Sequence, residues 1–255
     1  MSLRWEEEEL QALRIISTSN EPVGSWRLAE ALTKAGFPTS EATAGRILKD
    51  LDYKGLTQKM GYKGRLLSEK GWGRLRSLER EKQRRSTGEE FLHLLRAHGP
   101  EELVELLVAR RAIERETARL AAGRISPAEV ASLAEIVARH ERHLRDGVLS
   151  ASDDADFHRR IAEGSRNRVL AAALDLIRHD DELTPALEYI RREMKGTVAS
   201  DHARILAAIS AGDPVGAEEA MVNHIDNVIR DVRRFWNKNP GEAETPPAGT
   251  TPATK

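Results

Sequence analysis

Residues 25–67 read SWRLAEALTKAGFPTSEATAGRILKDLDYKGLTQKMGYKGRLL, and this stretch predicts two helices followed by a β-hairpin. Apolar side chains recur at helical spacing in both halves of its helical part. The first helix is expected to end at Gly36, and the second to begin after Ser40, a residue type that caps helix N-termini. Two short strands are predicted around the glycine-containing turn 61–64. This order is typical of a helix-turn-helix that continues into a wing.

A further amphipathic helix precedes this stretch, with Leu10, Leu13 and Ile16 on one face. Residues 1–70 are therefore predicted to form a winged-helix domain. Residues 41–85 hold 13 Lys or Arg against 6 Asp or Glu, a balance of +7 in a chain whose net charge is −1. Basic charge that coincides with the second helix of the pair and the wing indicates contact with double-stranded DNA. A protein-interaction module of the same fold is the alternative.

In a helix-turn-helix, the second helix enters the major groove with polar side chains on its exposed face. The wing can reach the neighbouring backbone or minor groove, and a lysine farther along the helix can reach a phosphate. The DNA-contacting side chains predicted on this basis are Ser40, Glu41, Thr43, Arg46 and Lys49 of the helix, with Tyr62, Lys63 and Arg65 of the hairpin.

The remainder of the chain is predicted to be helical. Residues 71–98 read as a charged helical connector, in which Gly88 leaves it open whether one helix continues throughout. Residues 99–236 contain seven helix-period segments and no strand-period segment. Residues 237–255 are polar and proline-rich, which is typical of a disordered tail. The fold class is mainly α, with a winged helix followed by an antiparallel all-α bundle.

The composition indicates a soluble cytoplasmic protein. The chain has no cysteine, which excludes disulfides and thiolate metal sites. No apolar run approaches the roughly 20 residues that cross a bilayer, so we expect no membrane association. The acidic N-terminus lacks the apolar core of a signal peptide.

Four residues of the helical half are candidate metal ligands. Asp154 and His158 are four residues apart and so share one helix face. His202 and His224 lie on two later predicted helices. Three imidazoles and one carboxylate suit a divalent ion, with Zn as the first choice and Ni or Mn as alternatives. Surface or satisfied core histidines are the competing interpretation, and His140 with His143 forms a rival pair.

The sequence around these residues resembles the FadR C-terminal domain (FCD) family of the GntR superfamily. The resemblance covers residues 101–234 and rests on motifs that begin at Arg110, Asp154, Asp201 and Ala217. It implies an antiparallel helical bundle in which Asp154, His158, His202 and His224 hold a divalent metal beside a pocket for a small organic acid. It also implies that Arg110 faces this cavity and pairs with an effector carboxylate, whereas a surface salt bridge is the alternative. Asn167 is expected to cap the helix that follows it.

The winged helix departs from the usual GntR pattern. That superfamily typically shows Ser-Arg and then Val-Arg-x-Ala-Leu in its recognition helix, where this chain has TAGRIL at residues 43–48. Base-reading residues of the superfamily therefore cannot be carried over, and no operator sequence is predicted.

Together these features predict a non-enzymatic transcription regulator, a repressor that binds operator DNA as a homodimer. A small organic acid bound at or near the metal would change the packing of the bundle and hence the spacing of the two winged helices. A metal-ion sensor is one alternative, and a metal-dependent hydrolase with an accessory winged helix is another. Against the hydrolase, no motif places a further Asp or Glu beside the site as a general base.

Overall fold

The computed structural model describes residues 3–96, 99–148, 151–178, 183–194, 196 and 198–239. The chain divides into two compact units, Met1–Leu92 and His93–Lys255. Each unit has its own hydrophobic core. This agrees with the sequence, in which a charged segment separates two groups of amphipathic helices.

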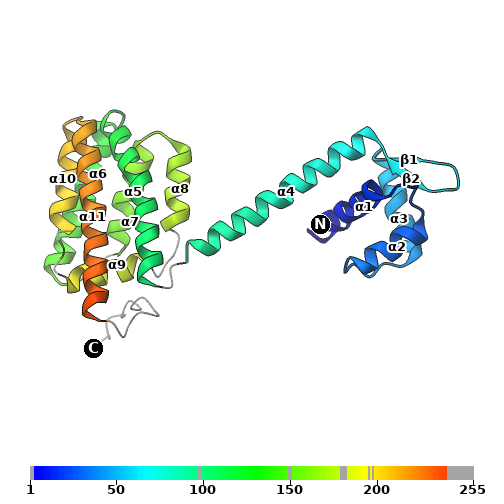
Figure 1. The fold of residues 1–255 in the computed structure, drawn as a ribbon. Coiled ribbons are helices and arrows are strands. Elements are labelled where there is room, and N and C mark those ends of the chain that lie inside the picture. Colours follow the sequence, from blue (N-terminus) through cyan, green and yellow to red (C-terminus); the bar gives the residue numbers. More distant parts are fainter. Residues whose placement is uncertain are drawn as a thin grey trace. The chain divides into compact units, whose positions relative to one another are not determined.

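The first unit is a winged helix, which confirms the predicted fold class (Figure 1). Its elements are α1 (Leu3–Thr18), α2 (Ser25–Lys34), α3 (Glu41–Tyr53), β1 (Thr57–Lys59), β2 (Arg65–Leu67) and the first turns of α4 (Glu69–Leu94). The strands pair antiparallel, with Gln58 opposite Leu66. The apolar faces of the helices meet in one core that includes Leu13, Leu28, Leu32, Leu48 and Leu51.

The wing is tied to the segment before α2 by a two-way backbone bridge between Val23 and Arg65. Gly64 precedes this bridge with a φ of +128°, a region that disfavours side chains. A Cβ atom at this position would lie 2.5 Å from the Val23 carbonyl carbon, so the close approach requires glycine. The wing is therefore anchored at its base while Tyr62 and Lys63 at its tip are exposed.

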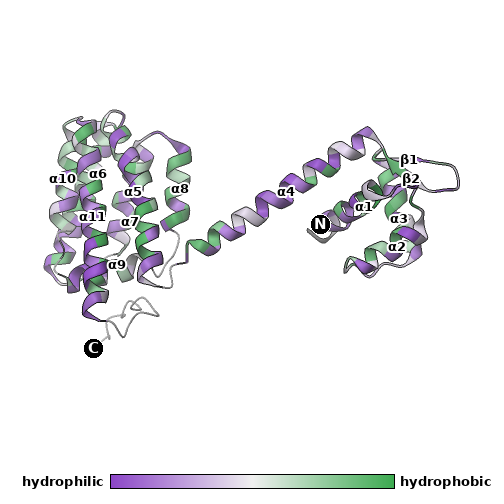
Figure 2. Cartoon of the chain, viewed as in Figure 1, coloured by the Kyte–Doolittle hydropathy of each residue, from purple (hydrophilic) through white to green (hydrophobic). Residues whose placement is uncertain are grey.

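Helix α4 is one unbroken helix through Gly88, which answers the question that the sequence left open. Its first turns bury Leu75 and Leu78 in the winged-helix core. From Arg80 to Leu94 every side chain is exposed, and Figure 2 shows the helix as hydrophilic over most of its length. A single glycine destabilises a helix by about 1 kcal/mol relative to alanine. The neighbouring residues have high helix propensity, so the helix stays continuous.

The second unit is an all-α bundle of seven helices in the described part of the chain. They are α5 (Pro100–Ala122), α6 (Pro127–Arg145), α7 (Ala151–Gly164), α8 (Arg168–Arg178), α9 (Leu183–Glu193), α10 (Val198–Ser210) and α11 (Pro214–Lys238). Their number equals that of the helix-period segments in the sequence. Ser126 and Glu129 form a capping box at the start of α6. The Asn167 side chain accepts hydrogen bonds from the backbone N–H groups of Val169 and Leu170, as expected of a cap.

The bundle encloses polar side chains within an apolar shell. Helices α5 and α11 pack along each other, and α10 packs against both α11 and α6 (Figure 1). The apolar core includes Leu107, Phe157, Ile161, Ile205 and Ile225. Arginine, glutamate, aspartate and histidine side chains are buried among these helices as well. Groups of this kind are buried only when they pair with one another or bind a ligand.

None of the helices in the described part of the chain combines the length and hydropathy of a bilayer-spanning segment. Helix α11 continues through Lys238, two residues beyond the predicted end of the bundle at residue 236. The rest of the predicted disordered tail, from residue 240 onward, lies outside the described residues, as do residues 97–98 of the connector.

Candidate functional site

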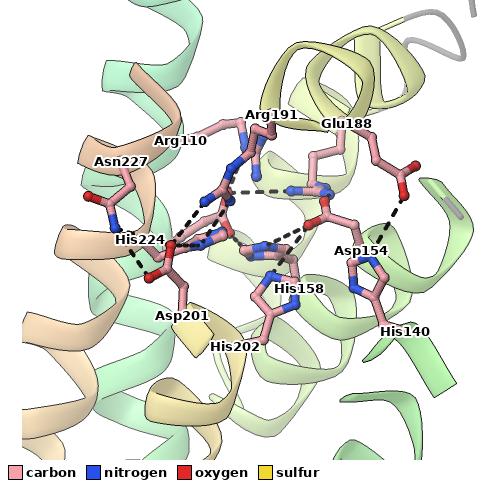
Figure 3. A network of polar contacts seen from close by, with 12 residues as sticks. Arg110, His140, Asp154, His158, Glu188, Arg191, Asp201, His202, His224 and Asn227 are labelled. Atoms are coloured by element: carbon pink, nitrogen blue, oxygen red, sulfur yellow. Dashed lines mark hydrogen bonds and ion pairs between the residues drawn. The ribbon is translucent and has the colours of Figure 1, made fainter. Parts of the chain in front are cut away.

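Three helices bring the four candidate metal ligands together. Asp154 and His158 lie on one face of α7, His202 on α10 and His224 on α11. One ligand atom from each lies within 4.8 Å of the others. The three histidine side chains are about 1% exposed or less. Figure 3 shows the four side chains converging between the helices. A carboxylate and three imidazoles in this arrangement form a plausible donor set for Zn, Ni or Mn.

A carboxylate orients His158 from the side opposite the cluster. Glu114 of α5 contacts the Nδ1 atom of His158, which turns Nε2 toward Asp154 at 3.7 Å from Oδ1. Glu114 is held in turn by Arg110, whose Nε donates to Oε1 at 2.7 Å. This chain of contacts matches the carboxylate–histidine arrangement that positions metal-binding imidazoles.

A second carboxylate performs the same task at His224. Asp201 of α10 places Oδ2 3.5 Å from the Nδ1 atom of His224. Asn227 donates to both oxygens of Asp201, at 3.2 and 3.1 Å, and Arg191 of α9 donates to Oδ2 at 3.0 Å. Arg191 Nη1 lies 3.4 Å from the same Nδ1 atom, so Asp201 and Arg191 both face the Nδ1 side of the ring and Nε2 is the nitrogen left for a metal.

Asp154 is also held by a partner of its own. Arg178 of α8 donates to Oδ2 at 2.6 Å, while Oδ1 lies 3.4 Å from the Nε2 atom of His202. Among the residues that the structure describes, the Nε2 atoms of His158 and His202 have no hydrogen-bond partner. Metal-binding imidazoles characteristically have such ring nitrogens, buried and without a protein partner.

The electrostatics favour the protonation states that metal binding requires. Burial raises the pKa of Glu114, but Arg110 and His158 outweigh it and lower that pKa overall. Burial likewise opposes ionisation of Asp154, yet His158 and Arg178 hold its pKa well below the usual range. Desolvation lowers the pKa of His202 to about 4 and places that of His224 well below 6.5. The carboxylates are therefore ionised and these two imidazoles neutral at pH 7, with lone pairs available to a cation.

Metal-stripped protein is expected to lose stability as the pH falls from 6.5 to about 4.5. The pKa of His202 is about 6.5 in the unfolded chain and about 4 in the folded one. Below pH 6.5 the unfolded chain therefore takes up a proton that the folded chain does not, and the free energy of unfolding falls as the pH approaches 4. The pKa of His140 is raised, so its contribution changes above pH 6.5 instead. Urea unfolding at pH 7, 6 and 5 measures the loss. His202→Asn should flatten this profile, and an equally steep profile in that variant would contradict the assignment.

A small cavity adjoins the four ligands. It is lined by Arg110, His140, Asp154, Leu187, Glu188, Arg191, His224 and Val228. Its free volume is about 20 Å³, room for roughly one water molecule. Arg110 does face this cavity, and its salt bridge to Glu114 is buried, with the two side chains 4% and 1% exposed. The alternative of a surface salt bridge is therefore wrong.

Most of the predicted DNA-contacting residues of the winged helix are exposed. Ser40, Glu41, Arg46 and Lys49 of α3 are exposed, and Thr43 is half-buried. The Ser40 hydroxyl caps α3 by accepting from the backbone N–H of Thr43 at 3.2 Å. Glu41 accepts from Ser25 at 2.9 Å, and Thr43 accepts from Arg46 at 3.2 Å. Ser40, Glu41 and Thr43 thus also order the start of the helix.

Arg65 differs from the other residues predicted to contact DNA. Its Nη2 atom lies 2.9 Å from Asp52 Oδ2, and its Nε donates to the same oxygen at 3.0 Å. Its side chain is 16% exposed. This pair joins the wing to α3, so Arg65 has a structural role whether or not it reaches DNA. At the wing tip, Tyr62 is 97% exposed and Lys63 is exposed as well.

Sequence reasoning missed the residues that surround the metal ligands. Glu114 and Asp201 belong to the family motifs, but no function was predicted for either. No sequence pattern pointed to Arg178, Glu188 or Arg191. No sequence motif placed a further carboxylate beside the site, whereas in the structure Glu114 contacts His158 and Glu188 lines the cavity. Asp201 is adjacent to His202 in the sequence, but in the structure it contacts His224 instead.

Two domain families match the chain, one for each unit. Residues 105–227 match the FCD domain, and this range contains all four candidate ligands. Residues 10–75 match the Ribonuclease R winged-helix domain. The first match covers α5 to most of α11, and the second covers the winged helix.

Similar proteins include bacterial regulators and an archaeal one. A regulatory protein assigned to the L-lactate dehydrogenase operon of Escherichia coli is 29% identical over 182 residues, which cover 69% of each chain. The global nitrogen regulator NrpR of Methanocaldococcus jannaschii is 42% identical over 62 residues, 24% of this chain and 11% of that protein. The solved structure of Streptococcus agalactiae GntR aligns with a TM-score of 0.46 and 21% identity, covering 88% of this chain and 98% of that one.

Proposed function

Because the chain belongs to the GntR superfamily of transcription regulators and carries an FCD domain, we propose that this domain senses a small organic acid through a bound divalent metal. Asp154, His158, His202 and His224 would hold the metal, with zinc as the first choice and nickel or manganese as alternatives. The metal would supply a Lewis-acidic centre to which an acid carboxylate can bind.

The observation that carries this proposal is the convergence of the four donors with dedicated orienting groups. Glu114 and Asp201 each hold the Nδ1 side of one histidine, and Arg178 holds one oxygen of Asp154. A fortuitous histidine cluster would have no need for carboxylates on two rings, whereas metal sites regularly use them to fix ring orientation.

The charge around the cluster also supports a cation. Carboxylates outnumber guanidinium groups in the buried network, with Glu114, Asp154, Glu188, Asp201 and Asp231 against Arg110, Arg178 and Arg191. Uncompensated negative charge in a low-dielectric interior is unfavourable, and a divalent ion offsets it. With the ion in place, Arg110 and Arg191 at the cavity wall would favour an anionic effector.

Effector binding is expected to move the walls of the cavity. The free volume holds about one water molecule, so even a three-carbon acid requires expansion. Helix α9 contributes Leu187, Glu188 and Arg191 to the wall, and Arg191 also contacts Asp201 of α10. A shift of α9 would therefore alter contacts on neighbouring helices, which is the kind of two-state packing change that carries allosteric coupling.

We further propose that the protein acts as a homodimeric repressor, with α3 in the major groove and the wing tip against the backbone. Exposed Arg46, Lys49 and Lys63 supply positive charge on that surface. Effector-induced repacking of the bundle would change the separation of two winged helices on adjacent half-sites. Either release or tightening of the DNA is compatible with this scheme.

Arg46→Ala and Lys63→Ala are each expected to weaken DNA binding by about tenfold. Because Lys63 is proposed to contact a phosphate, Lys63→Ala should also make DNA binding less sensitive to salt. The slope of log K against the logarithm of the salt concentration should decrease in magnitude by about one. Mobility-shift titrations at several salt concentrations measure both effects, using genomic fragments that the unmodified protein has selected. Lys34→Ala, which removes an exposed lysine paired with Glu30 on α2, is the matched control. Unchanged binding in both test variants would remove the DNA assignment of α3 and the wing.

A metal-dependent hydrolase is retained as a second candidate because Glu188 lies in the cavity beside the proposed metal. A carboxylate in this position could accept a proton from an attacking water molecule. Zinc-loaded protein that cleaves p-nitrophenyl acetate faster than a His202→Ala variant would favour this candidate. Effector binding without product formation would favour regulation.

A further inference from the structure

Two buried groups in the cavity take no part in the proposed ligand set. His140 lies on α6 and Glu188 on α9, with 3.8 Å between Nε2 and Oε1 and side chains 2% and 5% exposed. Among the described residues, neither ring nitrogen of His140 has a hydrogen-bond partner. At 3.8 Å the pair makes an ionic contact but is too far apart for a direct hydrogen bond, and a molecule bound between the two groups would supply one to each.

The pair is close enough to the proposed metal for one small molecule to reach both. The ring centroids of His140 and His202 are 5.4 Å apart. Arg110, Arg191 and His224 line the same cavity (Figure 3). Glu188 and Arg191 are three residues apart on α9 and thus share one helix face. An acid whose carboxylate faces the metal or Arg191 would present its next atoms to His140 and Glu188.

The chemistry of the pair specifies the second group of that molecule. The Glu188 carboxylate repels a second anion and accepts hydrogen bonds, while His140 can donate one. A hydroxyl group donates to the first and accepts from the second. An oxygen about 2.8 Å from each atom fits their 3.8 Å separation. An ammonium group could donate to Glu188, but it has no lone pair with which to accept a hydrogen bond from His140.

We propose that His140 and Glu188 bind a hydroxyl group of the effector and thereby select hydroxy acids over unsubstituted and amino acids. This inference rests on the proposed metal-dependent acid site. It adds a ligand class and two specificity-determining residues that lie outside the metal-binding set.

Calorimetry on zinc-loaded full-length protein tests the inference with matched acids. Lactate, propionate and alanine differ only at the second carbon, and malate with succinate and gluconate with hexanoate provide larger pairs. In at least one set, the hydroxy acid is expected to bind at least about tenfold more tightly than its partner. Glu188→Ala should reduce this ratio toward one by weakening the binding of the hydroxy acid more than that of its partner. Glu193→Ala, which removes an exposed carboxylate of the same helix, should leave the ratio unchanged.

The outcomes separate this inference from the proposed function. If no acid of the panel binds the zinc-loaded protein, the acid site itself is wrong and the inference falls with it. If acids bind but each hydroxy acid matches its partner, or alanine matches lactate, the inference is wrong and the acid site stands. An unchanged ratio in Glu188→Ala would overturn the assignment to this pair. Zinc stoichiometry and thermal unfolding verify that Glu188→Ala is folded. His140→Phe provides the second test, because it replaces the imidazole with an aromatic ring that cannot form the hydrogen bond, and it should also reduce the ratio.

Discussion

Replacing His224 with alanine is expected to lower the zinc affinity of the protein by more than about a hundredfold. Loss of an orienting group alone weakens metal sites ten- to a hundredfold, and His224 is proposed as a direct ligand. His202→Ala should have an effect of the same order. Titration of metal-stripped protein against a zinc-competing fluorescent chelator measures the dissociation constants.

His93→Ala is the matched control for both variants, because His93 is exposed on α4 and outside the cluster. Thermal unfolding of the metal-stripped variants separates lost ligation from lost folding. If His202→Ala and His224→Ala both retain one tightly bound zinc per chain, the proposed ligand set is wrong.

Replacing Glu114 with alanine is expected to destabilise the metal-stripped bundle by about 3–5 kcal/mol. The variant leaves the guanidinium of Arg110, 4% exposed, without its hydrogen-bonded counter-charge. It also removes the group that holds the Nδ1 side of His158. Breaking a buried pair by removing one partner has an effect of this size because the other charge stays buried. Urea unfolding monitored by circular dichroism measures the change in the free energy of unfolding.

Glu116→Ala provides the comparison on the same helix. Glu116 pairs with Arg119 at the surface, with side chains 37% and 42% exposed, so its loss should change stability by about 0.5 kcal/mol or less. If Glu114→Ala is no more destabilising than Glu116→Ala, the buried network does not support the site as described.

Local sequence signals predicted the helices well because their ends are encoded locally. The Ser126–Glu129 capping box and the Asn167 cap both depend on residues within three positions of each other. The spacing of Asp154 and His158 likewise follows from the helical repeat alone. Convergence of these two with His202 and His224 came from the family resemblance, since no local rule relates residues on separate helices.

The orienting groups could not be predicted because they act across helices. Glu114 meets His158 only through the packing of α5 against α7. Asp201 precedes His202 in the chain, yet adjacent helical residues diverge by about 100°, so it faces His224 on α11 instead. The continuity of α4 through Gly88 was also undecidable, since one glycine weakens a helix without ending it.

The winged helix remains the part whose specificity is least transferable from relatives. Its sequence lacks the usual GntR recognition-helix pattern, and it matches the Ribonuclease R winged-helix domain over residues 10–75. The fold follows from packing positions such as Leu28, Leu48 and Leu51, which many winged helices share. Arg46, which we propose contacts DNA, is exposed, so the packing positions that determine the fold do not determine its identity.

Metal dependence of acid binding tests the central claim most directly. The measurement is calorimetric titration of lactate, malate and gluconate into zinc-loaded protein and into the same protein after the metal has been removed. We expect at least one acid to bind the loaded protein with one molecule per chain, and to lose that binding when the metal is stripped. Equal binding of the acids to both forms, or no binding to either, would contradict the account.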